Sequence, residues 1–268
     1  MGCVFCYFCN GKQHNLLRIA MDNILKVIVA MMVMMIVAAG CNKPEDPNQG
    51  NHENQGNDTI VVPVGDTTDL SYVDLGLPSG TLWAVCNVGA DTPEEYGDYY
   101  AWGETQPKDV YDWNSYLYGD FTFESYVLFK YCTSKNYGLD GFVDSLTVLE
   151  PDDDVVRVCW GEDWRIPTID EWEELFQNTT CVWTALNGVD GWLFTALNGN
   201  SLFLPAAGYW WDSEYNGAGL GVYWSCSLNK EFPNRAWGFH FNPYSCHLCG
   251  SSDRNRGQTV RAVRSNID

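Results

Sequence analysis

Residues 164–175 read Trp-Arg-Ile-Pro-Thr-Ile-Asp-Glu-Trp-Glu-Glu-Leu, and this stretch carries the firmest local signal in the sequence. Thr168 and Glu171 have the spacing of a capping box, in which the hydroxyl accepts a free backbone N–H and the carboxylate reaches back. Acidic residues in the first turn also suit the helix dipole. Trp172, Leu175 and Phe176 then fall on one helical face. We therefore predict a short amphipathic helix that begins after Thr168 and buries this face.

The sequence after this helix has the pattern of short strands. An Asn187-Gly188 turn separates two apolar segments, 182–185 and 192–195, and Asn-Gly is a strong hairpin signal. A second Asn-Gly turn, at 198–199, precedes another strand. Further strands are expected at 202–204, 221–224, 236–241 and 259–264. Few helices, many short strands and long loops rich in glycine and aromatic residues indicate an α+β domain with an antiparallel sheet.

The N-terminal region has the features of a bacterial lipoprotein signal. The 13 apolar residues from Val27 to Ala39 would reach about 20 Å as a helix, which is short of the roughly 30 Å hydrocarbon core. The run ends on Ala38-Ala39-Gly40-Cys41, a lipobox with Ala38 where leucine is most common. We predict a signal region over residues 1–40 with its true start at Met21, cleavage before Cys41 and lipidation of Cys41.

The segment that follows the cysteine is polar throughout. Residues 42–59 contain no large apolar side chain, so they cannot bury enough surface to offset their chain entropy, and we predict a disordered tether. Residues 60–268 are long enough for one substantial core and are expected to form a single domain. The predicted location is the outer membrane, on the cell surface or the periplasmic face, with the membrane contacted through the lipid anchor.

The charge of the chain excludes one class of partner. With 15 basic and 35 acidic residues, the formal net charge is −20. Removal of residues 1–40 takes away three basic residues and one acidic residue, which leaves a charge of −22. Because nucleic-acid binding depends on basic patches that contact phosphates, we expect no nucleic-acid partner.

Six segments, in order along the chain, resemble the Fibrobacter succinogenes major paralogous domain family. They are Asp74–Ala84 (DLGLPSGTLWA), Tyr99–Thr105 (YYAWGET), Trp164–Thr168 (WRIPT), Phe203–Tyr209 (FLPAAGY), Tyr223–Ser225 (YWS) and Val260–Arg264 (VRAVR). That family is similar to the formylglycine-generating enzymes and, more distantly, to C-type lectins. The resemblance covers about residues 70–266. It implies a C-type-lectin-like fold with a twisted antiparallel sheet, one or two helices and long irregular loops, but no settled activity.

One dense cluster of soft ligands occurs near the C-terminus. Cys246, His247 and Cys249 lie within four residues, and His240 precedes them. If 236–241 alternates as a strand, Trp237, Phe239 and Phe241 share one face and His240 lies on the other. The cluster fits a zinc or copper site, a redox pair or loop disulfide, or two unconnected thiols. The formylglycine-generating enzymes bind copper through a C-terminal cysteine pair, but with four intervening residues instead of two.

The aromatic run Tyr209, Trp210, Trp211 and Asp212 is the best candidate for a ligand-binding surface. We place it in a loop, where exposed Trp and Tyr rings could bind the face of a sugar, and we expect one of the two tryptophans to be exposed. The acidic triplet Asp152–Asp154 is interpreted as a helix start and not as a calcium site. Cys159, between Val158 and Trp160, is predicted to be a small buried side chain.

These observations favour a binding protein over an enzyme. The sequence shows no spacing typical of a Ser-His-Asp or Cys-His catalytic set and no phosphate-binding loop. We therefore expect no cofactor and predict that the domain binds an extracytoplasmic glycan or protein. Two alternatives stay open: a metal- or thiol-dependent oxidoreductase that uses Cys246 and Cys249, and a structural envelope or adhesin subunit.

Overall fold

The computed structural model describes residues 71–266, except 123–124 and 218, and it does not describe the side chains of 246–249. All described residues belong to one compact unit that spans Asp58–Asp268. The predicted signal region, the lipidation site Cys41 and the tether over 42–59 lie outside the described residues. Among those described, no helix has the length and apolar character needed to cross a membrane.

The described residues form five sheets in which every named strand pairs antiparallel with its neighbours. The strands are β1 (Tyr72–Asp74), β2 (Leu82–Asn87), β3 (Gly119–Thr122), β4 (Ser125–Leu128), β5 (Trp164–Arg165), β6 (Thr179–Leu186), β7 (Val189–Ala196), β8 (Ser201–Pro205), β9 (Tyr209–Trp211), β10 (Glu214–Asn216), β11 (Gly221–Leu228), β12 (Arg235–Asn242), β13 (Ser245–Asp253), β14 (Gly257–Gln258) and β15 (Arg261–Arg264). Their orders are β1-β2-β15-β5, β10-β9-β14, β11-β12-β13, β3-β4 and β6-β7-β8. The predicted antiparallel, sheet-rich α+β architecture is confirmed.

The helices are few and short. They are η1 (Leu139–Gly141), η2 (Pro151–Asp153), α2 (Val155–Trp160) and α3 (Ile169–Gln177). Helix α3 confirms the prediction from the sequence, because Thr168 and Glu171 form the complete capping box and Trp172 and Leu175 are fully buried.

The acidic triplet also begins a helix, as predicted. The Asp154 carboxylate caps α2 by accepting hydrogen bonds from the backbone N–H groups of Val156 (2.9 Å) and Arg157 (3.4 Å). Asp153 accepts hydrogen bonds from Tyr118 and Lys130, each at 2.6 Å. The Asp154 carboxylate therefore caps helix α2, and the Asp153 carboxylate is occupied by hydrogen bonds to Tyr118 and Lys130.

The hairpin β6–β7 follows from its turn residues. Leu186 pairs with Val189, so Asn187 and Gly188 form a two-residue turn, with φ angles of 49° and 85°. Such a turn needs positive φ at both positions, which Asn and Gly tolerate best. Strand β8 then adds to β7, as the second Asn-Gly turn predicts.

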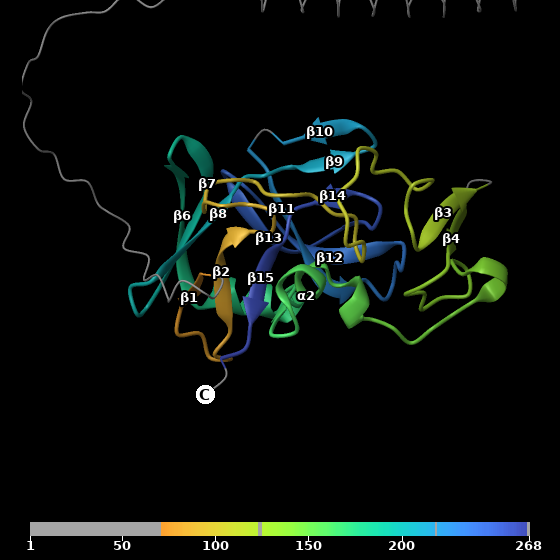
Figure 1. Ribbon diagram of the computed structural model, residues 1–268, viewed down its shortest axis with the longest axis horizontal. Helices are drawn as coiled ribbons and strands as arrows, with labels where there is room; N and C mark the ends of the chain where they lie inside the picture. The colour runs from red at the N-terminus through yellow and green to blue at the C-terminus, as the bar shows by residue number, and fades with distance from the viewer. Residues whose placement is uncertain (1–70, 123–124, 218, 267–268) are drawn as a thin grey trace, which may run out of the picture. The chain divides into compact units, whose positions relative to one another are not determined.

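Two hydrophobic core clusters lie on opposite faces of the same strands. In β2, Trp83 belongs to one cluster and Ala84 to the other, and in β15 Val263 and Ala262 divide in the same way. This division follows from the alternation of side chains along a strand. Figure 1 shows β15 beside β2. The last described strand therefore lies inside the sheet that begins with the first described strands, between β2 and β5.

One expectation about a single side chain is wrong. Cys159 is exposed, because helix α2 buries Val155 and Val156 and packs Trp160 against Trp164 (ring centroids 5.5 Å apart), which turns Cys159 outward. In β12, Phe239 and Phe241 enter the core, whereas Trp237 is half-buried and belongs to none of the core clusters. Register shifts on both sides of Gly238 interrupt the regular alternation of β12.

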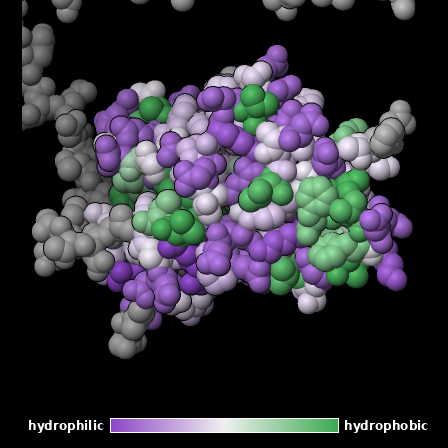
Figure 2. Space-filling view, turned by 45° about the vertical axis from the view of Figure 1, so that its right-hand side comes forward, coloured by the Kyte–Doolittle hydropathy of each residue, from purple (hydrophilic) through white to green (hydrophobic). Residues whose placement is uncertain are grey.

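Apolar side chains lie at the surface in and near the β3–β4 hairpin. Phe121, Phe129 and Leu139 are all exposed and belong to none of the core clusters. Figure 2 shows hydrophobic groups gathered over the part of the surface near this hairpin, within a mostly polar face.

An ion pair fixes the start of α3. The Arg165 guanidinium donates two hydrogen bonds to the Glu171 carboxylate (2.6 and 2.5 Å), which also accepts the Thr168 backbone N–H at 2.8 Å. Burial acts to raise the pKa of Glu171, but Arg165 and Thr168 outweigh burial and hold this pKa below its ordinary value of 4.5. The ionised carboxylate therefore stabilises the fold.

We predict that Glu171→Gln lowers the free energy of unfolding by about 2 kcal/mol near neutral pH, because it removes a charge-assisted pair. A carboxylate with a depressed folded-state pKa contributes its full stabilisation above its unfolded pKa and loses it as the pH falls through the folded pKa. The difference between wild type and variant should therefore narrow below pH 4.5. Urea unfolding across an acid pH series measures it.

Glu173→Gln is the matched control, because Glu173 lies on the same helix and its carboxylate accepts only an exposed hydrogen bond from Gln177. We expect this variant to remain close to wild type in the same series. A Glu171→Gln difference that is constant with pH would contradict the assignment of stabilising charge to Glu171.

Candidate ligand-binding site

The aromatic run lies in a strand and not in the predicted loop. Tyr209–Trp211 form β9, which pairs with β10 on one side and with β14 on the other. Asp212, at φ 57°, begins the two-residue turn into β10. The strand forms because a distant segment, Gly257–Gln258, supplies backbone partners, and a local reading of the sequence does not show them.

Strand alternation separates the two tryptophans. Trp210 turns inward and packs against Tyr215 (ring centroids 5.5 Å apart) and Tyr99 (6.4 Å). Trp211 points the other way and is 54% exposed. The expectation that one of the two tryptophans faces solvent is confirmed, and the exposed one is Trp211.

An arginine lies over the face that Tyr209 and Trp211 share. The Arg256 guanidinium carbon is 5.3 Å from the centre of the Tyr209 ring and 5.1 Å from that of Trp211. A guanidinium in this position is attracted by the negative face of each ring. We call Tyr209, Trp211 and Arg256 the aromatic platform.

A cavity of about 260 Å³ adjoins the platform. Tyr209 and Arg256 belong both to the platform and to the cavity wall, and the other polar side chains of the wall come from β12 and β13. The polar residues that line it are Tyr209, Arg235, His240, Asn242, Ser251, Ser252 and Arg256. The fold thus brings together Tyr209 and His240, which the sequence placed in two separate candidate sites.

The His240 ring packs over the backbone of Gly250 in the neighbouring strand. A Cβ atom at position 250 would collide with the ring, so glycine allows the ring to take this position. Ser252 Oγ lies 3.5 Å from His240 Nε2, at the outer limit of a hydrogen bond. The cavity wall therefore offers imidazole, hydroxyl, amide and guanidinium groups, a set suited to binding oxygen atoms.

The predicted metal site is only partly within the described structure. Backbone pairing places His240 opposite His247 and Phe241 opposite Cys246, whereas the side chains of Cys246, His247 and Cys249 lie outside the described residues. Within the described part, no three His, Cys, Asp or Glu side chains gather in a way that could hold a metal ion. The metal, redox-pair and disulfide hypotheses for this cluster stay predictions.

A loop behind the platform fixes β9 in place. Tyr111 exchanges two backbone hydrogen bonds with Asp212 (2.8 and 3.1 Å), and its hydroxyl donates to the carbonyl of Tyr99 at 2.6 Å. Its ring fills the space where a side chain at Gly257 would lie, at 2.7 Å from an added Cβ. The Tyr111 ring therefore packs directly against β14 in the three-stranded sheet β10-β9-β14.

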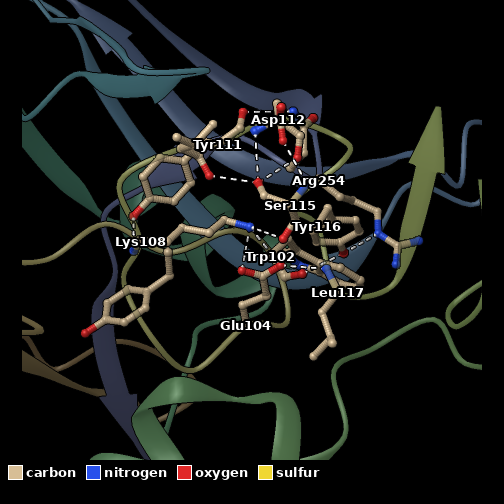
Figure 3. Close-up of polar contacts among 12 residues, drawn as sticks. Trp102, Glu104, Lys108, Tyr111, Asp112, Ser115, Tyr116, Leu117 and Arg254 are labelled. Carbon is tan, nitrogen blue, oxygen red and sulfur yellow. Dashed lines mark hydrogen bonds and ion pairs between the residues drawn. The ribbon is translucent and has the colours of Figure 1, made fainter.

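Figure 3 shows how the rest of this loop is held. Lys108 forms an ion pair with Glu104 at 2.8 Å and donates to the carbonyl of Ser115 at 2.9 Å. The buried Arg254 donates from Nε to the Tyr116 hydroxyl at 2.8 Å, and that hydroxyl donates to the Trp102 carbonyl at 2.7 Å. These contacts hold the loop that contains Tyr111, and Tyr111 in turn pairs with Asp212 at the end of β9.

The sequence prediction missed the arginines of this site. Arg235 comes from β12, and Arg256 follows the last residues of β13. One signal was present: four of the 15 basic residues fall between Arg254 and Arg264 in an otherwise acidic chain. Their spatial roles differ, because Arg254 and Arg261 are fully buried whereas Arg256 reaches the cavity.

No protein-family model, curated protein or solved structure matches the chain.

We predict that Trp210→Ala and Trp211→Ala differ in their effect on stability. Trp210→Ala removes packing against Tyr99 and Tyr215 and should lower the free energy of unfolding by about 2 kcal/mol. Trp211→Ala should lower it by about 1 kcal/mol or less, because the side chain is half exposed. Chemical denaturation of both variants measures the difference, and equal losses would contradict the assigned orientations.

Proposed function

We propose that this chain is a lipid-anchored extracytoplasmic protein whose domain binds a glycan, without catalysis, through the aromatic platform and the adjoining cavity. The observation that carries the proposal is the half-exposed Trp211 ring beside a wall of hydrogen-bond donors. The C–H groups of a sugar ring pack on the electron-rich face of an aromatic ring. Its hydroxyl groups need donors and acceptors such as Asn242, Ser252 and Arg256.

The exposure of the other tryptophans supports the assignment to this face. All 12 tryptophans lie within the described residues, and Trp211 is the most exposed of them. A cavity of about 260 Å³ is small for a drug-sized ligand, whose pockets start at about 300 Å³. It suits one sugar unit or one substituent, with the remainder of the glycan on the platform.

We also propose that the fold is C-type-lectin-like. Three of the segments that carry the family resemblance contribute to the single sheet β1-β2-β15-β5, which joins the first and last described strands. The long irregular stretches around β3 and β4 fit the large loop region that such a fold would have. The strand arrangement therefore supports the proposed fold. The proposed glycan ligand is argued separately, from the aromatic platform.

The proposed location rests on the sequence. The apolar run that ends at Cys41, the polar segment over 42–59 and the acidic composition together favour a domain held outside an outer-membrane surface by acyl chains. At this place the domain meets glycans and proteins and no nucleic acid.

We predict that the full chain, purified in detergent, binds a subset of a glycan array and that Trp211→Ala reduces this binding at least about tenfold, because stacking on an exposed aromatic ring is lost. Phe129→Ala is the matched control, since it removes an exposed aromatic side chain that does not belong to the platform. Binding that is unaffected by Trp211→Ala would refute the platform. An absence of glycan binding would favour the structural-subunit alternative.

We predict that Cys41→Ser abolishes lipidation and releases the protein from membranes, because the predicted lipid attachment requires the thiol of Cys41. Metabolic labelling with a palmitate analogue in a bacterial host, followed by membrane fractionation, measures both effects. Cys159→Ser serves as the control and should retain label, since Cys159 lies in helix α2 of the folded domain.

A further inference from the structure

The cavity beside the platform has a charge opposite to that of the chain. The protein carries a net charge of −20, yet two arginines line this cavity, and none of its lining residues is acidic. By contrast, the charged residue in the wall of a second cavity of about 180 Å³ is Glu94, and in a third of about 570 Å³ it is Asp190. Among these three cavities in the described structure, the one beside the platform is suited to a negative group.

The two guanidinium groups share one carboxylate. Arg256 Nη2 lies 3.5 Å from one oxygen of Asp253, and Arg235 Nε lies 3.8 Å from the other. Both distances exceed the 2.7–2.9 Å of a strong charge-assisted hydrogen bond. Asp253 thus neutralises one of the two positive charges and leaves an excess of one at the cavity wall.

Hydrogen-bonding capacity is also left over on both arginines. The Nε atoms of Arg235 and Arg256 are buried and have no hydrogen-bond partner among the described residues. A buried N–H group without a partner destabilises the protein, and a charged one does so more strongly. These Nε atoms are covered by protein atoms, so an oxyanion in the cavity would pair with the outer nitrogens of the two guanidinium groups, and Ser252 and Asn242 offer further contacts in the same wall.

Arg256 connects this cavity to the platform. The same guanidinium lies over the Trp211 ring at 5.1 Å and lines the cavity. A ligand that fits both would carry its negative group beside an apolar ring face. Acidic sugars have this form, because a carboxylate or sulfate is attached directly to the pyranose ring.

We infer that the cavity binds the carboxylate or sulfate of an acidic saccharide whose ring lies against Trp211. Arg256 and Arg235 pair with the oxyanion, while the platform holds the sugar. This inference rests on the proposed glycan-binding function and specifies the class of glycan.

The test compares matched oligosaccharides by titration calorimetry with the full chain in detergent. The ligands are a uronic acid oligosaccharide, its carboxyl-reduced neutral form and a sulfated derivative of that neutral form. We expect the carboxylated or the sulfated form to bind at least about tenfold more tightly than the neutral form, the effect of one charge-assisted contact. Which of the two acidic forms binds better identifies the source of the oxyanion.

Variants then assign the preference to the cavity. Arg256→Gln and Arg235→Gln should remove most of the preference for the acidic forms. Arg157→Gln removes the same charge from helix α2, outside the cavity wall, and should retain it. Arg256→Lys keeps the charge and should keep part of the preference, which gives a readout if Arg256→Gln does not fold. Circular dichroism monitors folding in each case.

The outcomes separate the two proposals. Equal affinity for neutral and acidic forms, with binding still sensitive to Trp211→Ala, would refute the oxyanion site and leave the glycan-binding function in place. A preference for acidic forms that survives both arginine substitutions would also refute it. If none of these oligosaccharides binds, the inference is wrong, whereas the proposed function is refuted by an absence of binding across the glycan array.

Discussion

The fold depends on how the irregular middle of strand β11 satisfies its backbone hydrogen bonds. This strand pairs with β12 from Gly221 to Trp224 and again at Leu228, and the ladder is interrupted in between. Buried backbone groups without partners are costly, so the interruption needs compensation. Backbone bonds of Cys226 with Leu149 and Pro167 supply part of it, and two tryptophan N–H groups add to it: Trp172 donates to the carbonyl of Trp224 at 3.2 Å, and Trp102 donates to that of Ser225 at 2.8 Å. Because Trp172 belongs to α3 and Trp102 to a long loop, one interrupted strand fixes the position of both.

This role explains why the domain is rich in tryptophan. Trp172 contacts Trp83 of β2 (ring centroids 4.7 Å apart) and stacks on Phe239 of β12 (4.9 Å), and Trp224 in turn donates from its ring to the carbonyl of Tyr100 at 2.7 Å. A tryptophan can fill the core and complete a backbone hydrogen bond with the same side chain, which leucine or phenylalanine cannot do. The abundance of tryptophan is therefore mainly a consequence of the architecture, and the ligand hypothesis depends on the orientation of one residue, Trp211.

The predictions from sequence succeeded where the determining contacts are local. The capping box of α3 spans three residues, and the Asn187–Gly188 turn decides the β6–β7 hairpin, so short patterns were enough. They failed where distant segments decide. Strand β9 requires Gly257–Gln258 as a partner, and the cavity joins Tyr209 to side chains of β12 and β13. The arginines of the site were overlooked for the same reason: nothing in the spacing of Arg235 and Arg256 indicates that both flank Asp253.

The distribution of charge bears on how an acidic saccharide would be selected. A net charge of −20 repels such a ligand at a distance, but at physiological ionic strength charges are screened beyond about 8 Å, so the repulsion is confined to the vicinity of the surface. At the cavity wall the nearest charges are those of Arg235, Arg256 and their shared partner Asp253, and charges that touch the ligand are screened less than distant ones. Added salt would therefore weaken the repulsion and the attraction together, and its net effect on affinity has no fixed sign. For this reason single arginine substitutions, which change only the short-range contact, are a better probe of recognition than ionic strength.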